Sequence, residues 1–429
     1  MNFIRSRALL MAAITAAAAP LDAADEAPAA RAYLDRVQAL IEQVRIDLPQ
    51  AIRAADMVAE SFVRGRGLGI RGGAGLGDEL SYRAGGFQAL RPGVAEPGDA
   101  ILYAFGAGRG PQPLRASVEA ELADARRLRD GGSVIVGIAS RAQLHGLGLL
   151  SEARAVCTVL LDNHVVAPDS EVLEAPLETV ANAITAWTLC AELFSACTRR
   201  GRTPVVLGDP HAPRARWRWE RYRGLRFHHV TKLEPIEPGV LGEAWLLGLR
   251  SVLRDVGTAS WPALAGAAHR AADTVRAGGR VFVRVGPRSV ARDHGGRLGG
   301  DPGFFTRLDH DGSDPGDLVP GALVPGERDF VIAIGRDHVP GSSDWGEPEM
   351  LRGAGRGVCW VVNACMVNLD RMLVPGELLI DLQCPYDDAV VRVPRYDVPI
   401  GPTTGVVAET VWWCLSIQAI KDWTRRSRP

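Results

Sequence analysis

The sequence has no surplus of either charge. Its 49 lysine and arginine residues stand against 50 aspartate and glutamate residues, which gives a formal net charge of −1. Nucleic-acid-binding proteins usually carry a clear basic surplus or stripe, so we expect no nucleic-acid partner. The one basic and aromatic stretch, residues 214–223, is interpreted as a solvent-facing helix or loop whose tryptophans pack on the body of the protein; a contact with RNA or phosphate is the alternative.

Cysteine is scarce, and the seven residues are irregularly spaced. The odd number and the lack of a Cys-x-x-Cys pair argue against a disulfide framework and a structural zinc site. His228 and His229 lack the i, i+4 partners of a helical zinc site, and the oxygen-rich stretch 309–317 does not have EF-hand spacing. We therefore expect no metal and no cofactor.

Long apolar runs are also lacking. Beyond the N-terminus, no uncharged segment is long enough to span a bilayer, which predicts no stable membrane insertion. Arg5 and Arg7 precede the apolar run 8–20, and small residues follow up to Ala24. This layout predicts a secretory signal peptide over residues 1–24 and export to the periplasm. The alternative is an alanine-rich helix at the start of a cytoplasmic protein.

Apolar strands and helices alternate along the first half of the chain, and 429 residues predict more than one domain. Strands that are apolar almost throughout are typical of a parallel sheet covered by helices on both faces. The predicted strands are 68–70, 100–105, 133–139 and 157–162; the predicted helices are 34–62 with a kink at Pro49, one from Asp78, 114–129 and 177–197.

The second half repeats this order of elements. Residues 281–285, 330–335, 357–364 and 379–381 correspond to the strands of the first half, and the helix 402–423 corresponds to 177–197, each with tryptophan near its middle. The run Glu-Pro-Ile-Glu-Pro, residues 234–238, interrupts the pattern. We therefore predict two divergent copies of one domain, over residues 31–234 and 239–425.

Three segments resemble the phosphosugar-binding branch of the SIS (sugar isomerase) superfamily. They are Asp-Glu-Leu-Ser-Tyr-Arg-Ala-Gly-Gly at 78–86, Asp-Asn-His at 162–164, and Ile-Gly-Pro-Thr-Thr-Gly-Val at 400–406. The resemblance implies an α/β fold with two flavodoxin-like doubly wound parallel sheets in tandem, related by a pseudo-two-fold axis. It also implies a sugar or sugar-phosphate ligand at the carboxyl ends of the strands, and a monomer containing an intramolecular pseudo-dimer, with a homo-oligomer as the alternative.

The loops that follow the strands supply the candidate ligand-binding residues, because such loops and helix N-termini offer free N–H groups to an anion. The family's serine-rich phosphate loop is missing from both halves, and backbone amides with an arginine would have to replace it. Thr403 and Thr404 could bind an anion or simply cap the last helix. The candidates are Gly73, Gly75, Gly106, Gly108, Arg109, Arg336, Thr403 and Thr404.

Two residues are candidates for catalysis. Glu79 resembles the catalytic glutamate of the superfamily's heptose-phosphate isomerases, although carboxylates near a helix N-terminus are also favourable without any catalytic role. His164 follows a strand end facing the expected cleft, but a solvated loop histidine would look the same. The histidine that those isomerases carry on the last helix has no counterpart in 177–197.

These observations support two hypotheses. The first is a protein that binds a sugar phosphate or related carbohydrate derivative and retains aldose–ketose isomerase activity in its first domain. The second is a non-catalytic sugar-binding or sensing protein with degenerate sites. The loss of the serine loops favours the second hypothesis, whereas Glu79 and His164 favour the first.

Overall fold

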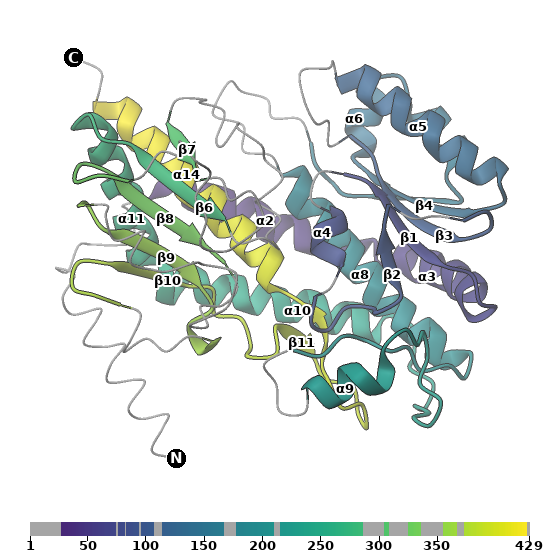
Figure 1. Ribbon diagram of the computed structural model, residues 1–429. Helices are drawn as coiled ribbons and strands as arrows, with labels where there is room; N and C mark the ends of the chain where they lie inside the picture. The colour runs from purple at the N-terminus through teal and green to yellow at the C-terminus, as the bar shows by residue number, and fades with distance from the viewer. Residues whose placement is uncertain are drawn as a thin grey trace.

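Two parallel five-stranded sheets lie on either side of a central layer of helices (Figure 1). The signal peptide predicted for residues 1–24 lies outside the described residues and stays a prediction, as does export. The computed structural model describes residues 27–73, 76–81, 83–93, 96–106, 114–166, 177–209, 215–285, 304–308, 325–335, 355–366 and 373–426.

The first sheet has the strand order β2-β1-β3-β4-β5, and all its pairs are parallel. This is the 2-1-3-4-5 order of flavodoxin-like folds. Four of the strands match the apolar runs of the sequence. The sequence gives no signal for β2, a three-residue edge strand that ends at a proline. The strands are β1 (Leu68–Gly72), β2 (Leu90–Pro92), β3 (Ala100–Ala104), β4 (Val134–Ala139) and β5 (Val159–Asp162).

The second sheet repeats this order as β7-β6-β8-β9-β10, again with parallel pairs. The predicted fold class, α/β with two flavodoxin-like parallel sheets, is therefore confirmed. A separate antiparallel pair, β11 and β12, leads into the last helix. The strands are β6 (Val281–Val285), β7 (Phe305–Arg307), β8 (Phe330–Ile334), β9 (Val358–Val362), β10 (Leu378–Asp381), β11 (Ala389–Val391) and β12 (Ile400–Pro402).

Helices cover both faces of the first sheet. Three of them, α5 (Leu114–Asp130), α6 (Arg141–Gly146) and α7 (Leu150–Val156), lie over its outer face, where Ile101, Tyr103 and Phe105 form a separate apolar cluster. The inner faces of both sheets meet the central helices in one continuous core. The remaining helices are α2 (Pro28–Ile46), α3 (Leu48–Val63), α4 (Leu76–Leu80), α8 (Glu178–Arg199), α9 (Ala215–Tyr222), α10 (Val240–Asp255), η1 (Val256–Ser260), α11 (Trp261–Arg276), η4 (Ala364–Met366) and α14 (Thr404–Arg426).

The central helix α8 is apolar all round because protein surrounds it. Every residue from Thr179 to Thr198 is buried. By length and composition α8 could cross a membrane, and it is the one helix of the described part of the chain that could. Its complete burial instead agrees with a core helix, which needs no polar face.

The first helix of each half packs against the last helix of the other half. Helix α2 lies along α14, and α10 lies along α8. The backbone N–H groups of Ala29 and Ala30, at the start of α2, donate to Oε1 of Gln418 on α14. The domain boundaries predicted at 31–234 and 239–425 stay a prediction, but the two halves complete each other's helical layer.

The helix predicted from Asp78 differs from the observed structure. Helix α4 is only one turn long and ends at Leu80. The chain then turns through Gly85, whose φ of 83° lies in the left-handed region, and the Gly85 N–H donates to the carbonyl of Leu207. A long-range backbone pairing thus replaces the next helical turn, because glycine adopts this conformation at little cost.

Candidate functional site

The strand order of the first sheet reverses direction between β1 and β3, so their loops leave on opposite sides of the sheet. Ligands of open α/β sheets bind at such a switch point, outside the carboxyl ends of the strands. Glycines in left-handed conformations begin both loops: Gly72 (φ 64°) ends β1, Gly73 (φ 60°) follows it, and Gly106 (φ 91°) follows β3. The structure therefore places the predicted ligand residues Gly73 and Gly106 on either side of this switch point.

Close packing accompanies this backbone conformation. A Cβ atom on Gly73 would lie 2.7 Å from the Cβ atom of Ala104, the last residue of β3. Glycine at this position lets the loop after β1 pass directly over the end of β3. Four other predicted ligand residues, Gly75, Gly108, Arg109 and Arg336, lie outside the described residues, so their roles stay predictions.

The Gly106 N–H is engaged within the protein. It donates to Oε2 of Glu121 on α5 at 2.9 Å. Burial raises the pKa of the Glu121 carboxyl, and the bond from Gly106 opposes this shift. The amide that the sequence assigns to an anionic ligand is therefore bound to a carboxylate of the next helix.

Gln143 lies beside Gly106 and contacts Glu178, and neither residue is among those predicted from the sequence. The side-chain oxygen of Gln143 lies 2.8 Å from where a Cβ atom of Gly106 would stand. Gln143 Nε2 donates to Oε1 of Glu178, the first residue of α8, at 3.3 Å. The signal in the sequence is Ser140 directly after β4, which caps α6 by accepting from the Gln143 N–H. This cap fixes the start of the helix that carries Gln143.

Glu79 lies in the interior and has no exposed surface. Its carboxylate pairs with Arg83 Nη2 at 2.6 Å and accepts a hydrogen bond from Trp187 Nε1 on α8 at 3.0 Å. Burial raises the pKa of the Glu79 carboxyl, whereas the Arg83 charge acts to lower it. The carboxylate also lies against Gly405, where a Cβ atom would overlap it. Glu79 therefore joins α4 to the central helices α8 and α14.

Thr403 and Thr404 are buried at the start of α14. Both backbone N–H groups donate to Oδ1 of Asp388, at 3.2 Å for Thr403 and 2.8 Å for Thr404. The Thr404 hydroxyl donates to the same oxygen atom. An internal carboxylate thus takes the anion-binding position that the sequence suggests for an external ligand.

The structure brings together candidates that the sequence assigns to different halves. Gly405 follows Thr404 directly, so Glu79 of the first half meets the capped start of α14 from the second half. Glu79 and Arg83 form a buried ion pair, and the nearby like charge of Asp388 acts to raise the pKa of the Glu79 carboxyl. Buried charges need such pairing, because leaving one partner alone costs several kcal/mol.

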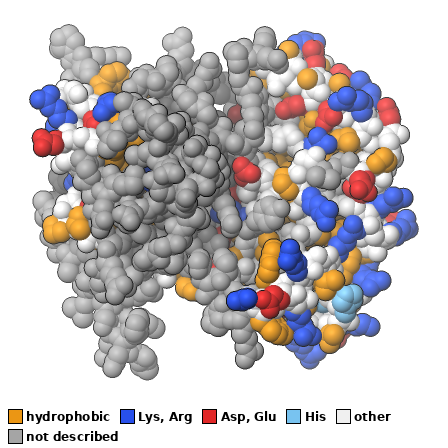
Figure 2. Space-filling view, in the orientation of Figure 1, with side chains coloured by type: hydrophobic (Ala, Val, Ile, Leu, Met, Phe, Trp, Pro, Cys, Tyr) orange, Lys and Arg blue, Asp and Glu red, His pale blue; other side chains and the backbone are white. Residues whose placement is uncertain are grey.

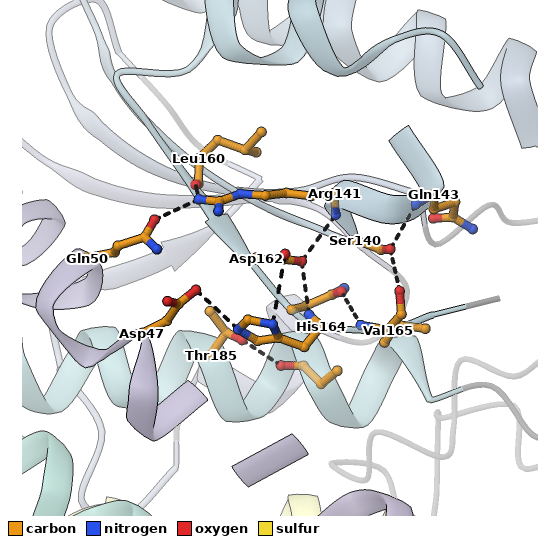
Figure 3. Close-up of polar contacts among 12 residues, drawn as sticks. Asp47, Gln50, Ser140, Arg141, Gln143, Leu160, Asp162, His164, Val165 and Thr185 are labelled. Carbon is orange, nitrogen blue, oxygen red and sulfur yellow. Dashed lines mark hydrogen bonds and ion pairs between the residues drawn. The ribbon is translucent and has the colours of Figure 1, made fainter. Parts of the chain in front are cut away.

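His164 follows the edge strand β5 of the first sheet, and Figure 3 shows its polar contacts. Its backbone has a φ of 58°, which is uncommon for a residue with a side chain. Its Nε2 atom lies 3.3 Å from Oδ2 of Asp47, in the turn between α2 and α3, and its Nδ1 atom lies 3.8 Å from Oδ2 of Asp162. The Asp162 Oδ1 atom accepts the backbone N–H groups of His164 and Arg141, which holds the turn after β5.

The two predicted catalytic residues do not meet in one site. Glu79 follows β1 and His164 follows β5, and strands β3 and β4 lie between them. Three strand spacings correspond to about 14 Å. Among the described residues, no group of three or more His, Cys, Asp or Glu side chains could hold a metal ion.

No protein-family model and no curated protein matches the sequence. The structure is similar to the C-terminal domain of glucosamine-fructose-6-phosphate aminotransferase from Francisella tularensis (TM-score 0.48, 10% identity, covering 90% of this chain and 95% of the other). It is also similar to a protein of Silicibacter pomeroyi DSS-3 described as a phosphosugar isomerase (TM-score 0.48, 13% identity, 92% and 98% covered).

A third similar structure is a protein of Salmonella typhimurium LT2 described as sugar-binding (TM-score 0.44, 12% identity, 90% and 99% covered). Each is a protein to which this chain is similar. The fold class follows from the strand order of the two sheets.

Proposed function

We propose that this protein binds a sugar phosphate or a related carbohydrate derivative at the carboxyl edge of the first sheet. The observation that carries the proposal is the switch point between β1 and β3, where left-handed glycines open both loops. This is the position at which open α/β sheets hold small ligands. The resemblance of residues 78–86 to the phosphosugar-binding branch of the SIS superfamily supports the same ligand class.

In the proposed site, one set of groups binds the phosphate of the ligand and another binds the sugar. We assign the phosphate to the loop after Gly106 and to Arg109, whose guanidinium can pair with two phosphate oxygens. We assign the sugar hydroxyls to Gln143, whose side-chain oxygen lies beside Gly106, and to Glu178, the carboxylate that accepts from Gln143 Nε2.

We infer that binding, without isomerisation, is the function of this site. An aldose–ketose isomerase needs a base within hydrogen-bond reach of two adjacent carbons. The Glu79 carboxylate is fully buried and already held by Arg83 and Trp187. His164 lies three strand spacings away from the strand that precedes Glu79. These observations favour a non-catalytic carbohydrate-binding or sensing protein over an isomerase.

Calorimetric titration of the purified protein with fructose 6-phosphate, fructose and inorganic phosphate tests the proposal. We expect the ester to bind more tightly than either of its parts. Arg109→Ala should weaken ester binding by about tenfold or more, as expected for a lost bidentate contact. Arg115→Ala is the matched control, because Arg115 is exposed on the following helix and pairs with Glu119. Equal binding of ester by both variants, or none by the wild type, contradicts the proposal.

The absence of catalysis is tested separately. Proton exchange at the carbon next to the carbonyl, followed by NMR in D₂O with fructose 6-phosphate, reports enediol formation. We expect no exchange above the background rate. Exchange that disappears in Glu79→Gln while the ester still binds would instead establish the isomerase hypothesis.

A further inference from the structure

Helix α9 lies in a strongly basic segment between α8 and α10. Residues 199–232 contain ten arginine and lysine residues but only two acidic ones, Asp209 and Glu220. The whole chain has a formal net charge of −1, so this segment is a local concentration of positive charge. The proposed carbohydrate site lies elsewhere, at the carboxyl edge of the first sheet.

One side of α9 is firmly attached to the body of the protein. Arg218 is buried, pairs with Asp397, and donates to the carbonyl of Val206 at 3.2 Å. The Tyr222 ring packs edge-on against the ring of His228, with their centres 4.4 Å apart. These contacts hold the helix in one orientation, so that its opposite side faces solvent.

The outward side of α9 exposes two tryptophans. Trp217 is 51% exposed and Trp219 is 47% exposed, although large aromatic side chains are usually well buried. Arg216, the residue before Trp217, is also exposed. In Figure 2, basic and hydrophobic side chains lie side by side over the part of the surface where Figure 1 places α9.

We propose that the outward side of α9 is a docking surface for a bilayer that contains anionic phospholipids. Tryptophan favours the headgroup level of a membrane, and each arginine near an anionic surface is attracted to it. Residues two apart on a helix point about 200° apart. Trp217 and Trp219 therefore project from opposite flanks of α9 and can enter a flat interface to the same depth.

A bilayer fits this surface better than a single-stranded nucleic acid does. Nucleic-acid stacking platforms combine a basic groove with aromatic rings that receive successive bases. On α9 the two rings are on opposite flanks of a convex helix, and Arg221 lies 5.1 Å over the Trp217 ring. Val230, in the same basic segment, is 79% exposed, and an aliphatic side chain gains more from lipid than from a phosphate backbone.

Co-sedimentation of the full chain with lipid vesicles tests the proposal. We expect binding to vesicles of phosphatidylcholine with phosphatidylglycerol, little binding to phosphatidylcholine alone, and weakening by salt. Arg216→Ala combined with Arg223→Ala should lower the partition coefficient by about fivefold for each arginine removed. Adding Trp219→Ser to these two substitutions should lower the partition coefficient further without changing the charge.

Matched controls separate this surface from general electrostatics. Arg115→Ala combined with Arg126→Ala removes two exposed arginines from α5 and should leave binding unchanged. Thermal unfolding of each variant verifies that it is folded. The proposal is overturned if the α5 variant loses as much binding as the α9 variant, or if neutral vesicles bind equally well. It is also overturned if a single-stranded oligonucleotide binds through the same residues and the anionic vesicles do not.

Discussion

Glu192 and Gln418 occupy the same position on the last helix of each half, fourteen residues after Glu178 and Thr404, where α8 and α14 begin. Each accepts backbone N–H groups from the start of the other half's first helix. Glu192 accepts from Gly239 at 2.9 Å and from Gly242 at 2.7 Å, and Gln418 accepts from Ala29 at 3.1 Å. We propose that this reciprocity, together with the repeated strand order, reflects duplication of one ancestral unit.

Removing the acceptor side chain of Glu192 or of Gln418 should destabilise the whole protein. Glu192→Ala leaves the N–H groups of Gly239 and Gly242 without their acceptor, at an expected cost of about 2–4 kcal/mol in the free energy of unfolding. Burial raises the pKa of the Glu192 carboxyl, and glutamine performs the same role at position 418, so Glu192→Gln should cost about 1 kcal/mol or less. Urea unfolding measures these differences.

The control for this prediction is Glu243→Ala. Glu243 is a half-exposed residue of α10 that pairs with Arg45, and surface pairs of this kind contribute about 0–1 kcal/mol. A Glu192→Ala variant no less stable than Glu243→Ala would show that the cap does not hold the halves together.

Gly405 should tolerate no side chain. A Cβ atom there would overlap the Glu79 carboxylate, which Arg83 and Trp187 hold in place. Gly405→Ala is expected to cost about 2–4 kcal/mol by thermal or urea unfolding. Gly266 in α11 is the matched control: no atom lies within 4 Å of its Cβ position, so Gly266→Ala should stabilise by up to about 1 kcal/mol. Equal effects at the two positions would contradict the packing of Glu79 against α14.

Asp388 combines two requirements, a left-handed backbone and an acceptor for the start of α14. Its φ is 63°, and its Oδ1 atom receives the N–H groups of Thr403 and Thr404. Asparagine tolerates this backbone and keeps the oxygen atom, so Asp388→Asn should cost about 1 kcal/mol. Asp388→Ala loses both and should cost about 2–4 kcal/mol. If the urea midpoints of Asp388→Ala and Asp388→Asn are equal, the hydrogen bonds from Thr403 and Thr404 to Asp388 do not contribute to stability.

His228 should make stability fall in acid. Burial, assisted by the nearby Arg218 charge, lowers the pKa of this imidazole from its ordinary value of 6.5 to about 4. As the pH falls from about 6.5 towards 4, the unfolded chain binds a proton that the folded protein does not, so the free energy of unfolding decreases. We expect His228 to account for about 1–2 kcal/mol of the difference between neutral pH and pH of about 4.5.

Urea unfolding at the two pH values measures this effect. His228→Phe keeps an aromatic ring against Tyr222 but cannot titrate, so the loss of stability in acid should be smaller than in the wild type. His229 is exposed, and His229→Ala should leave the difference unchanged. An unchanged acid sensitivity in His228→Phe would mean that another group is responsible.

The strands show how much of the fold the local sequence pattern predicts. The apolar run 281–285 coincides with β6, and the other long runs match their strands to within about two residues at each end. The short strands β2, β7, β11 and β12 were not predicted, because three residues are too few to show a periodic pattern. The predicted helix from Asp78 ends early because the Gly85 N–H pairs with Leu207, which lies far away in the sequence.

The candidate site divides in the same way. The glycine-rich ends of β1 and β3 can be located in the sequence, because glycine marks backbone that other residues rarely adopt. The environments of Glu79 and His164 cannot be predicted from the sequence. The contacts of Glu79 with Trp187 and Gly405, and of His164 with Asp47, join residues more than a hundred positions apart.

The sequence by itself determined the α/β class, the two sets of parallel strands and their order along the chain, because periodicity and apolar runs record which faces of each element are buried. Only the tertiary structure decided that the first helix of each half lies on the other half, that Glu79 is an interior charge packed against the start of α14, and that Glu79 and His164 stand apart. Those outcomes depend on which buried faces pack against each other. Packing and charge pairing between residues distant in the sequence determine this, and no local pattern records it.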